Sequence, residues 1–258
     1  ADGAPLVLLM GLGMQLTSWP EALVEMLTQR GHRVIRLDNR DAGLSQGFDH
    51  LGMPNVPWAA LRYALRMPVK SAYRIADMAA DTVGVLDALH IERAHIVGAS
   101  MGGMVAQHIA ATHPERVSAL TLLMTTSGAR HLPKPSAKAR AALLDRRGLD
   151  PKNIEAVVDR LERVFTVIGS PAYPAPEERL RTHAAEAFDR SYYPVGIARQ
   201  FGAQVLVHPG LLIGALRNRG TAAATGEWLA FIDADVEMPE DWLRPLMELE
   251  STGQADVF

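Results

Sequence analysis

The first half of the chain alternates short apolar runs with segments whose apolar residues recur at helical spacing. The runs have the continuous apolar character of strands buried on both faces of a parallel sheet, and they occupy residues 5–10, 33–37, 94–97 and 117–124. Between them, helical spacing is found at residues 19–29, 75–89 and 101–112. Strands and helices that alternate with short connections predict an α/β fold with a mostly parallel sheet. In such a fold the ligand site lies at the carboxyl ends of the strands.

The pattern changes at residues 128–200, where charged helical segments replace the buried strands. Residues 136–144 and 153–165 show helical spacing, and a proline-rich connection follows at 170–176. We interpret this region as a helical cap. The composition shifts again near Gln200, after which an apolar stretch at Gln204–Val207 has the character of a strand.

Composition excludes several classes of function. The 258 residues are 48% hydrophobic and 21% charged, with a net charge of −3. A chain without a basic field is not expected to bind nucleic acid, and no apolar run approaches the roughly 20 residues that span a bilayer. We therefore expect a cytoplasmic protein with no membrane partner, and the sequence leaves the oligomeric state open. The absence of cysteine excludes disulfides, thiolate metal sites and a cysteine nucleophile.

The pentapeptide Gly98-Ala99-Ser100-Met101-Gly102 joins an apolar run to a helical segment. This G-x-S-x-G pattern is typical of a sharp strand-to-helix turn that projects a serine hydroxyl above a sheet. Ser100 is therefore the candidate nucleophile. The backbone N–H of Met101, at the start of a helix, is the candidate donor to a developing oxyanion, with a second donor at Leu12 in the loop after the first strand.

Residues 4–200 resemble an α/β-hydrolase of the aclacinomycin methylesterase-like group. The matching stretches are residues 8–16, 34–45, 98–104 and 113–117. The resemblance implies a hydrolase-type sheet with a helical cap, and hydrolysis of a small-molecule carboxylic ester through an acyl-enzyme without a cofactor. It implies Ser100 as nucleophile and Leu12 and Met101 as oxyanion donors. Met10 stands where many relatives carry the histidine of a His-Gly pair.

The rest of the family pattern is not found in this sequence. Members continue past the cap into a strand that ends at an aspartate and then a strand that leads to a histidine, and two further strands precede the first strand seen here. None of the histidines after Ser100 follows an acid at the expected distance: His108, His113, His131, His183 and His208. We therefore expect an α/β-hydrolase core at residues 1–127 that lacks its first strands, a cap at 128–200, and impaired activity because Ser100 has no general base.

The segment from residue 201 to 258 has a different character. Residues 217–235 resemble the middle of an inverting family 2 glycosyltransferase, in which a helix leads into a strand ending in Asp-x-Asp. Here that pattern is Asp233-Ala234-Asp235. Two carboxylates at a strand end can hold a divalent metal, Mn²⁺ or Mg²⁺, that neutralises the diphosphate of a nucleotide sugar. This match covers only part of the glycosyltransferase pattern.

Three interpretations follow. In the first, strands of the glycosyltransferase-like segment, at Gln204–Val207 and Trp228–Ile232, extend the hydrolase sheet, and the protein is an esterase with an incomplete triad. In the second, the chain is part of a metal-dependent glycosyltransferase. In the third, it is a joined, chimeric chain without catalytic activity.

The polar turn that contains Asp38, Arg40 and Asp41 is expected to hold structural salt bridges.

Overall fold

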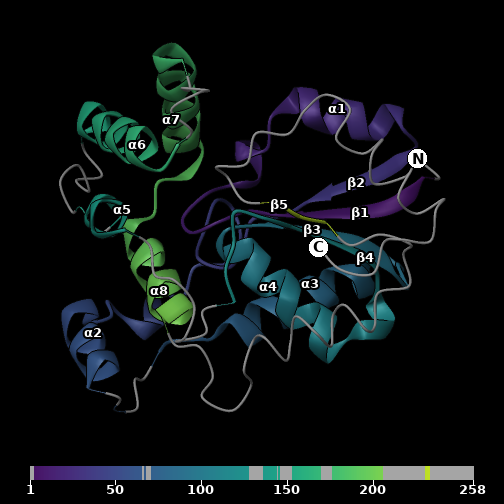
Figure 1. Cartoon of the computed structure of the whole chain (residues 1–258), viewed down its shortest axis with the longest axis horizontal. Coiled ribbons are helices and arrows are strands. Elements are labelled where there is room, and N and C mark those ends of the chain that lie inside the picture. The colour runs from purple at the N-terminus through teal and green to yellow at the C-terminus, as the bar shows by residue number, and fades with distance from the viewer. Residues whose placement is uncertain are drawn as a thin grey trace, which may run out of the picture.

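The computed structural model describes residues 3–65, 67, 71–127, 136–143, 145, 153–169, 176–205 and 230–232. Within this part of the chain the strands form a five-stranded sheet in the order β2-β1-β3-β4-β5, and every pairing is parallel (Figure 1). The strands are β1 (Ala4–Leu9), β2 (His32–Arg36), β3 (Ala94–Ala99), β4 (Val117–Leu123) and β5 (Ala230–Ile232). The mostly parallel sheet expected from the sequence is confirmed.

Helices cover both faces of this sheet. One face carries α1 (Glu21–Gln29), and the other carries α3 (Ile75–Ala88) and α4 (Met101–Thr112), as Figure 1 shows. The side chains of β1 alternate between the two layers: Leu6 and Leu8 belong to the cluster that contains Leu23 of α1, whereas Val7 and Leu9 belong to the cluster that contains α3 and α4 residues. Burial on both faces explains why the apolar run is continuous.

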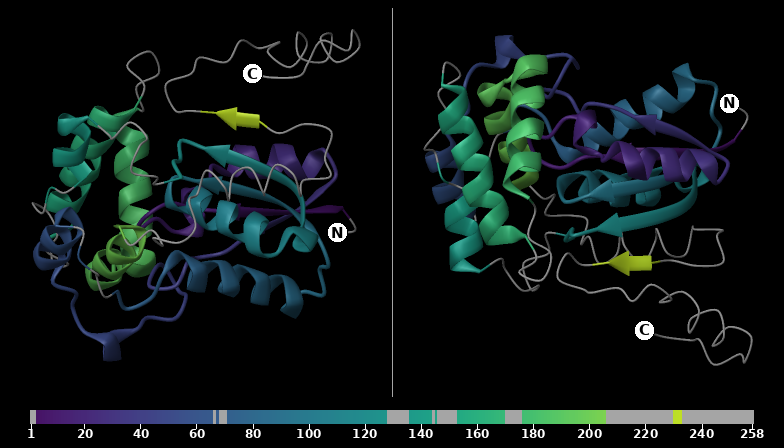
Figure 2. Two further views of the ribbon diagram at one scale, coloured as in Figure 1. Left: turned by 60° about the horizontal axis from the view of Figure 1, so that its bottom comes forward. Right: turned by 90° about the horizontal axis from the view of Figure 1, so that it is seen from above.

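The cap lies beyond the carboxyl ends of the strands. It contains α5 (Ala137–Leu143), α6 (Ile154–Ile168), α7 (Glu177–Ser191) and α8 (Pro194–Val205), and α2 (Val56–Ala64) lies beside α8. Both views in Figure 2 place these helices at the end of the sheet opposite the N-terminus. Short 3-10 turns occupy Leu16–Ser18, Asp49–Leu51 and Pro114–Arg116. The helical cap that the sequence indicated therefore stands over the edge of the sheet where a site is expected.

The structure corrects one element and confirms another after residue 200. Gln204 and Val205 end helix α8 and are not a strand, and α8 runs without a break past Gln200, where the sequence placed a boundary. A four-residue apolar run fits a strand or a helix end equally, so periodicity alone could not separate them. In contrast, β5 pairs with β4 from Thr121 opposite Ala230 to Leu123 opposite Ile232, so this part of the expected sheet extension is confirmed. Leu206 and Val207 lie outside the described residues.

Among the helices of the described residues, none combines the length and the apolar character needed to cross a bilayer.

Candidate active site

Ser100 occupies a strained position between β3 and α4. Its φ of 52° and ψ of −118° lie in a region that residues with a side chain rarely adopt. Neighbouring backbone holds it there: Ser100 N donates to the carbonyl of Leu123 at 3.0 Å, and Thr125 Oγ1 donates to the carbonyl of Ser100 at 2.6 Å. Hydrogen bonds from the end of β4 and the residues after it thus hold Ser100 in a strained conformation. This backbone geometry is typical of a nucleophile elbow.

The glycines around Ser100 allow the turn to be this tight. A methyl group on Gly98 would overlap the carbonyl oxygen of Gly102, and one on Gly102 would overlap the carbonyl oxygen of Leu9 at the end of β1. Both glycines are buried. The close approach of helix α4 to β1 and β3 therefore requires glycine at both positions. This steric requirement explains the two glycines of the G-x-S-x-G pattern.

Met101 is the first residue of α4, with its side chain fully buried. The first N–H groups of a helix have no acceptor within the helix, and the helix dipole makes this end partially positive. Gly103 N and Met104 N donate to the carbonyl of Ser100, at 3.0 and 3.3 Å. The N–H of Met101 precedes these two at the first position of the helix, and its role as an oxyanion donor stays a prediction.

The second predicted donor lies in a turn beside Ser100. Gly11, Leu12, Gly13 and Met14 form a β-turn closed by a bond of 3.2 Å from Met14 N to Gly11 O, with Gly13 at a φ of 67°. A positive φ at the third position is typical of a type II turn and favours glycine. A methyl group on Gly11 would lie 3.2 Å from Ser100 Cβ. The structure thus brings the Leu12 turn and Ser100 into direct proximity.

The polar turn after β2 is tied to its surroundings by ion pairs, as the sequence predicted. Arg40 binds Asp81 of α3 at 2.6 Å. The other two pairs connect the turn to the cap: Asp38 with Arg190 of α7 at 2.7 Å, and Asp41 with Arg199 of α8 at 2.8 Å. These carboxylates therefore serve to join the core to the cap.

Arg190, Arg199 and Gln200 are three polar residues of the cap that contact the turns after β1 and β2 and that the sequence analysis missed. Arg199 is 1% exposed and Gln200 is fully buried, which is unusual for these residue types. For Arg199 and Gln200 the available signal was their position between Ala198 and Phe201 in a helical segment, where a buried polar side chain would need partners. Without the fold, those partners could not be identified.

Two half-buried histidines of the described residues pair with hydroxyl groups other than that of Ser100. His95 Nε2 lies 2.8 Å from Thr121 Oγ1, and His183 Nε2 lies 3.0 Å from Ser18 Oγ. Burial lowers the pKa of both imidazoles, and for His95 the nearby His32 adds to this effect. His95 also precedes Ser100 by five positions along β3, a separation of about 16 Å in an extended strand. In the described part of the chain no histidine forms a hydrogen bond with Ser100 Oγ.

His131, His208, Asp233 and Asp235 lie outside the described residues. Within the residues that are described, no group of three or more acidic or histidine side chains could hold a metal ion. The metal site expected at Asp233 and Asp235 therefore stays a prediction.

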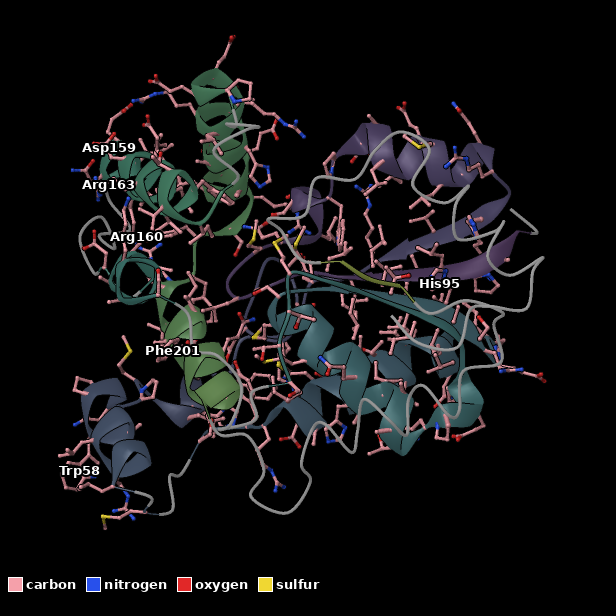
Figure 3. All side chains as sticks on the ribbon, viewed as in Figure 1. Trp58, His95, Asp159, Arg160, Arg163 and Phe201 are labelled. Atoms are coloured by element: carbon pink, nitrogen blue, oxygen red, sulfur yellow. The ribbon has the colours of Figure 1, made fainter. Side chains whose placement is uncertain are left out.

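A cavity of about 560 Å³ opens between α5 and α6 in the cap. Charged side chains make up much of its lining, which includes Lys138, Asp145, Asp159, Glu162 and Arg163. Figure 3 shows Asp159 and Arg163 on α6, on the outer side of the cap. None of its lining residues belongs to the elbow or the Leu12 turn, so this cavity is distinct from the candidate active site.

A parallel sheet with helices on both faces, a strained serine at a strand-to-helix turn and a cap over the strand ends define an α/β protein whose serine turn has the backbone geometry typical of a nucleophile elbow. Comparison with known families agrees with this class. The model of the alpha/beta hydrolase fold matches residues 4–169, and the chain belongs to this family. The model of glycosyl transferase family 2 matches residues 189–258.

Similar proteins include several hydrolases. The chain is 36% identical to rhodomycin D methylesterase DauP of Streptomyces sp. (strain C5) over 121 residues. This matched region is 47% of this chain and 35% of the relative. It is 37% identical over 151 residues to putative carbamate hydrolase RutD of Variovorax paradoxus, covering 56% of this chain and 47% of the relative. The chain thus spans less than half the length of these curated relatives.

Solved structures show the same fold at low identity. The meta-cleavage product hydrolase of Pseudomonas fluorescens IP01 has a TM-score of 0.60 at 17% identity, over 98% of this chain and 92% of the other. The enol-lactonase of Burkholderia xenovorans LB400 has a TM-score of 0.56 at 19% identity, over 98% and 91%. These likenesses extend beyond residue 169, in keeping with the position of α8 against the hydrolase core.

Proposed function

We propose that the chain hydrolyses small-molecule carboxylic esters, with Ser100 as the nucleophile. The observation that carries the proposal is the contact between the strained Ser100 and the turn of Gly11 and Leu12. Ser100 Oγ would attack the ester carbonyl carbon, and the carbonyl oxygen would accept hydrogen bonds from Met101 N–H and Leu12 N–H. The alcohol would leave with a proton, and water would release the acid from the acyl-enzyme.

The proposal includes low activity. Among the described residues no hydrogen bond joins an imidazole to Ser100, and the side chains of His95 and His183 pair with Thr121 and Ser18, so activation of the hydroxyl by an imidazole has no support among these residues. Oxyanion donors and substrate binding alone can still give about 10³- to 10⁴-fold acceleration over water. We therefore propose an esterase whose rate depends mainly on the Met101 and Leu12 donors.

The test is hydrolysis of p-nitrophenyl acetate by the chain and by Ser100→Ala. A matched control is Ser136→Ala, because Ser136 is an exposed serine whose hydroxyl accepts from Ala139 N at the start of α5. Ser100→Ala should lower the rate by less than about 100-fold, compared with about 10⁶-fold for loss of the serine from an intact triad. A fall of several orders of magnitude would show that a base reaches Ser100, and rates equal to background in all proteins would refute the esterase proposal.

A second candidate function rests on the match of residues 189–258 to glycosyl transferase family 2. Strand β5 ends at Ile232, immediately before Asp233, which is the arrangement the metal-binding Asp-x-Asp pattern requires. We propose that Asp233 and Asp235 bind Mn²⁺ or Mg²⁺. Titration with Mn²⁺ alone should show one site that Asp235→Ala removes and Glu240→Gln retains; equal binding by both variants would contradict it.

A non-catalytic, chimeric chain is the remaining interpretation. It predicts a broad, non-cooperative thermal transition with binding of a hydrophobic dye, whereas the two enzyme proposals predict a cooperative one. The melting curve of the unmodified chain separates these outcomes before any kinetic assay.

A further inference from the structure

Helix α8 lies against the turn that contains the proposed oxyanion donor Leu12. Gln200, fully buried, accepts a hydrogen bond of 2.7 Å from Gly13 N through its Oε1 atom. Its Nε2 atom donates to the carbonyl of Arg40 at 2.7 Å. One side chain of the cap thus connects the turn after β1 to the turn after β2.

A second residue of α8 covers the same turn. A methyl group on Gly13 would lie 2.9 Å from Cγ1 of Ile197, one helical turn before Gln200. Residues three positions apart share a helix face, so Ile197 and Gln200 approach the turn together. The turn is therefore held between Ser100 on one side, through Gly11, and α8 on the other, through Gly13.

The orientation of the peptide between Leu12 and Gly13 depends on the Gln200 acceptor. In a type II turn this peptide is rotated relative to the commoner type I turn, and the positive φ of Gly13 is the consequence. A buried N–H without an acceptor is costly, so the Gln200 Oε1 atom favours the orientation that is observed. Gln200 thus fixes the peptide on the C-terminal side of Leu12, and the bond from Met14 N to Gly11 O closes the turn around Leu12.

We propose that Gln200 is a positioning residue, which holds the Gly11–Met14 turn so that Leu12 N–H is directed at the developing oxyanion beside Ser100. This inference rests on the proposed ester hydrolysis. It also assigns a role in the hydrolase site to a residue beyond the segment that the hydrolase family model matches, and within the segment matched by glycosyl transferase family 2. An oxyanion donor acts only at the correct distance and direction, so a small displacement of the turn lowers the rate of the chemical step.

The inference is tested by replacing the Gln200 amide while keeping its volume. Gln200→Met removes both hydrogen bonds in a side chain of similar length, and Gln200→Glu keeps an oxygen acceptor for Gly13 N. Arg190→Gln is the matched control, because it cuts the bonds of α7 to Asp38 and to the side chain of Gln15 but leaves the Gly13 contact intact, so exchange is compared at Gly13. For each protein, kcat and KM for p-nitrophenyl acetate are measured together with amide hydrogen exchange of residues 10–15.

Gln200→Met should lower kcat by about 10- to 100-fold with KM changed less than about threefold, since loss of a whole oxyanion donor costs about 10²- to 10³-fold. It should also accelerate exchange at Gly13. Gln200→Glu should recover most of kcat, and Arg190→Gln should keep kcat within about twofold. If Gln200→Met does not fold, Gln200→Asn, whose amide is one carbon too short to reach Gly13, replaces it.

Different results would refute the positioning role of Gln200 and the esterase proposal. An active chain in which Gln200→Met keeps its kcat, or loses it only as much as Arg190→Gln does, overturns the positioning role and leaves the esterase proposal intact. A chain without Ser100-dependent turnover refutes the esterase proposal, and the exchange data then decide alone whether Gln200 holds the turn. Unchanged exchange at Gly13 in Gln200→Met overturns the inference in either case.

Discussion

Arg199 Nη1 lies 2.8 Å from Asp41 Oδ1, with the two side chains 1% and 0% exposed. Arg199 also donates to the carbonyl of Gly52 at 2.9 Å and to the hydroxyl of Tyr193 at 3.0 Å, and Phe48 N donates to Asp41 at 2.9 Å. These hydrogen bonds offset part of the hydration that the buried ion pair loses. It joins α8 to the turn after β2.

Arg199→Met should lower the free energy of unfolding by about 3–5 kcal/mol, because it leaves the Asp41 carboxylate buried without its partner. Urea unfolding followed by circular dichroism measures this. Asp41 has a φ of 62°, a conformation that asparagine accepts, so the double variant Arg199→Met with Asp41→Asn should recover part of the loss. A single variant as stable as the original chain would contradict the compensating role of the pair.

Gly98→Ala and Gly102→Ala should each destabilise the chain by about 1–3 kcal/mol or more, because the added methyl groups overlap backbone carbonyls and force α4 away from the sheet. Gly84→Ala is the matched control. Nothing lies within 4 Å of the methyl group that it would add to helix α3, so it should stabilise by about 0.5–1 kcal/mol. Thermal unfolding of the three variants tests this. Equal effects at all three positions would show that the elbow is not as tight as described.

Stability should fall as the pH is lowered from about 7.5 to 5.5. Burial lowers the pKa of His183 and His95 below the ordinary value of about 6.5, so between the two values the unfolded chain binds more protons than the folded one. Stability therefore rises with pH through this window and is fully present above about 6.5. His183→Gln should reduce the slope.

The partner of His183 supplies the control for this pH dependence. Ser18→Ala removes the hydroxyl that lies 3.0 Å from His183 Nε2 but leaves the imidazole buried. It should lower stability at every pH without changing the slope. Urea midpoints at several pH values measure both effects, and an unchanged slope in His183→Gln would argue that His183 does not contribute.

The sequence predicts the parts of the fold that depend on local pattern. The apolar run of β1 and the glycines around Ser100, between an apolar run and a helical segment, predict a buried strand and a tight turn, and both were found. The site around them depends on contacts between distant positions. Gly13 and Gln200 are 187 positions apart, and Asp41 and Arg199 are 158 apart, so no local pattern could pair them. The prediction of a strand at Gln204 was wrong because the local pattern was itself ambiguous. The apolar run was too short to distinguish a strand from the end of α8.

The pairing of β5 with β4 shows how a parallel sheet can accept an additional strand at its edge. Parallel pairing is made by backbone amides and carbonyls, which are the same in every sequence, and three residues of β5 satisfy the edge of β4 in register. An open edge is a site of unwanted association between molecules unless something covers it. A strand from a segment matched by a different family can therefore pair with the edge of β4 through backbone hydrogen bonds, and β5 then becomes the outer strand of the described sheet.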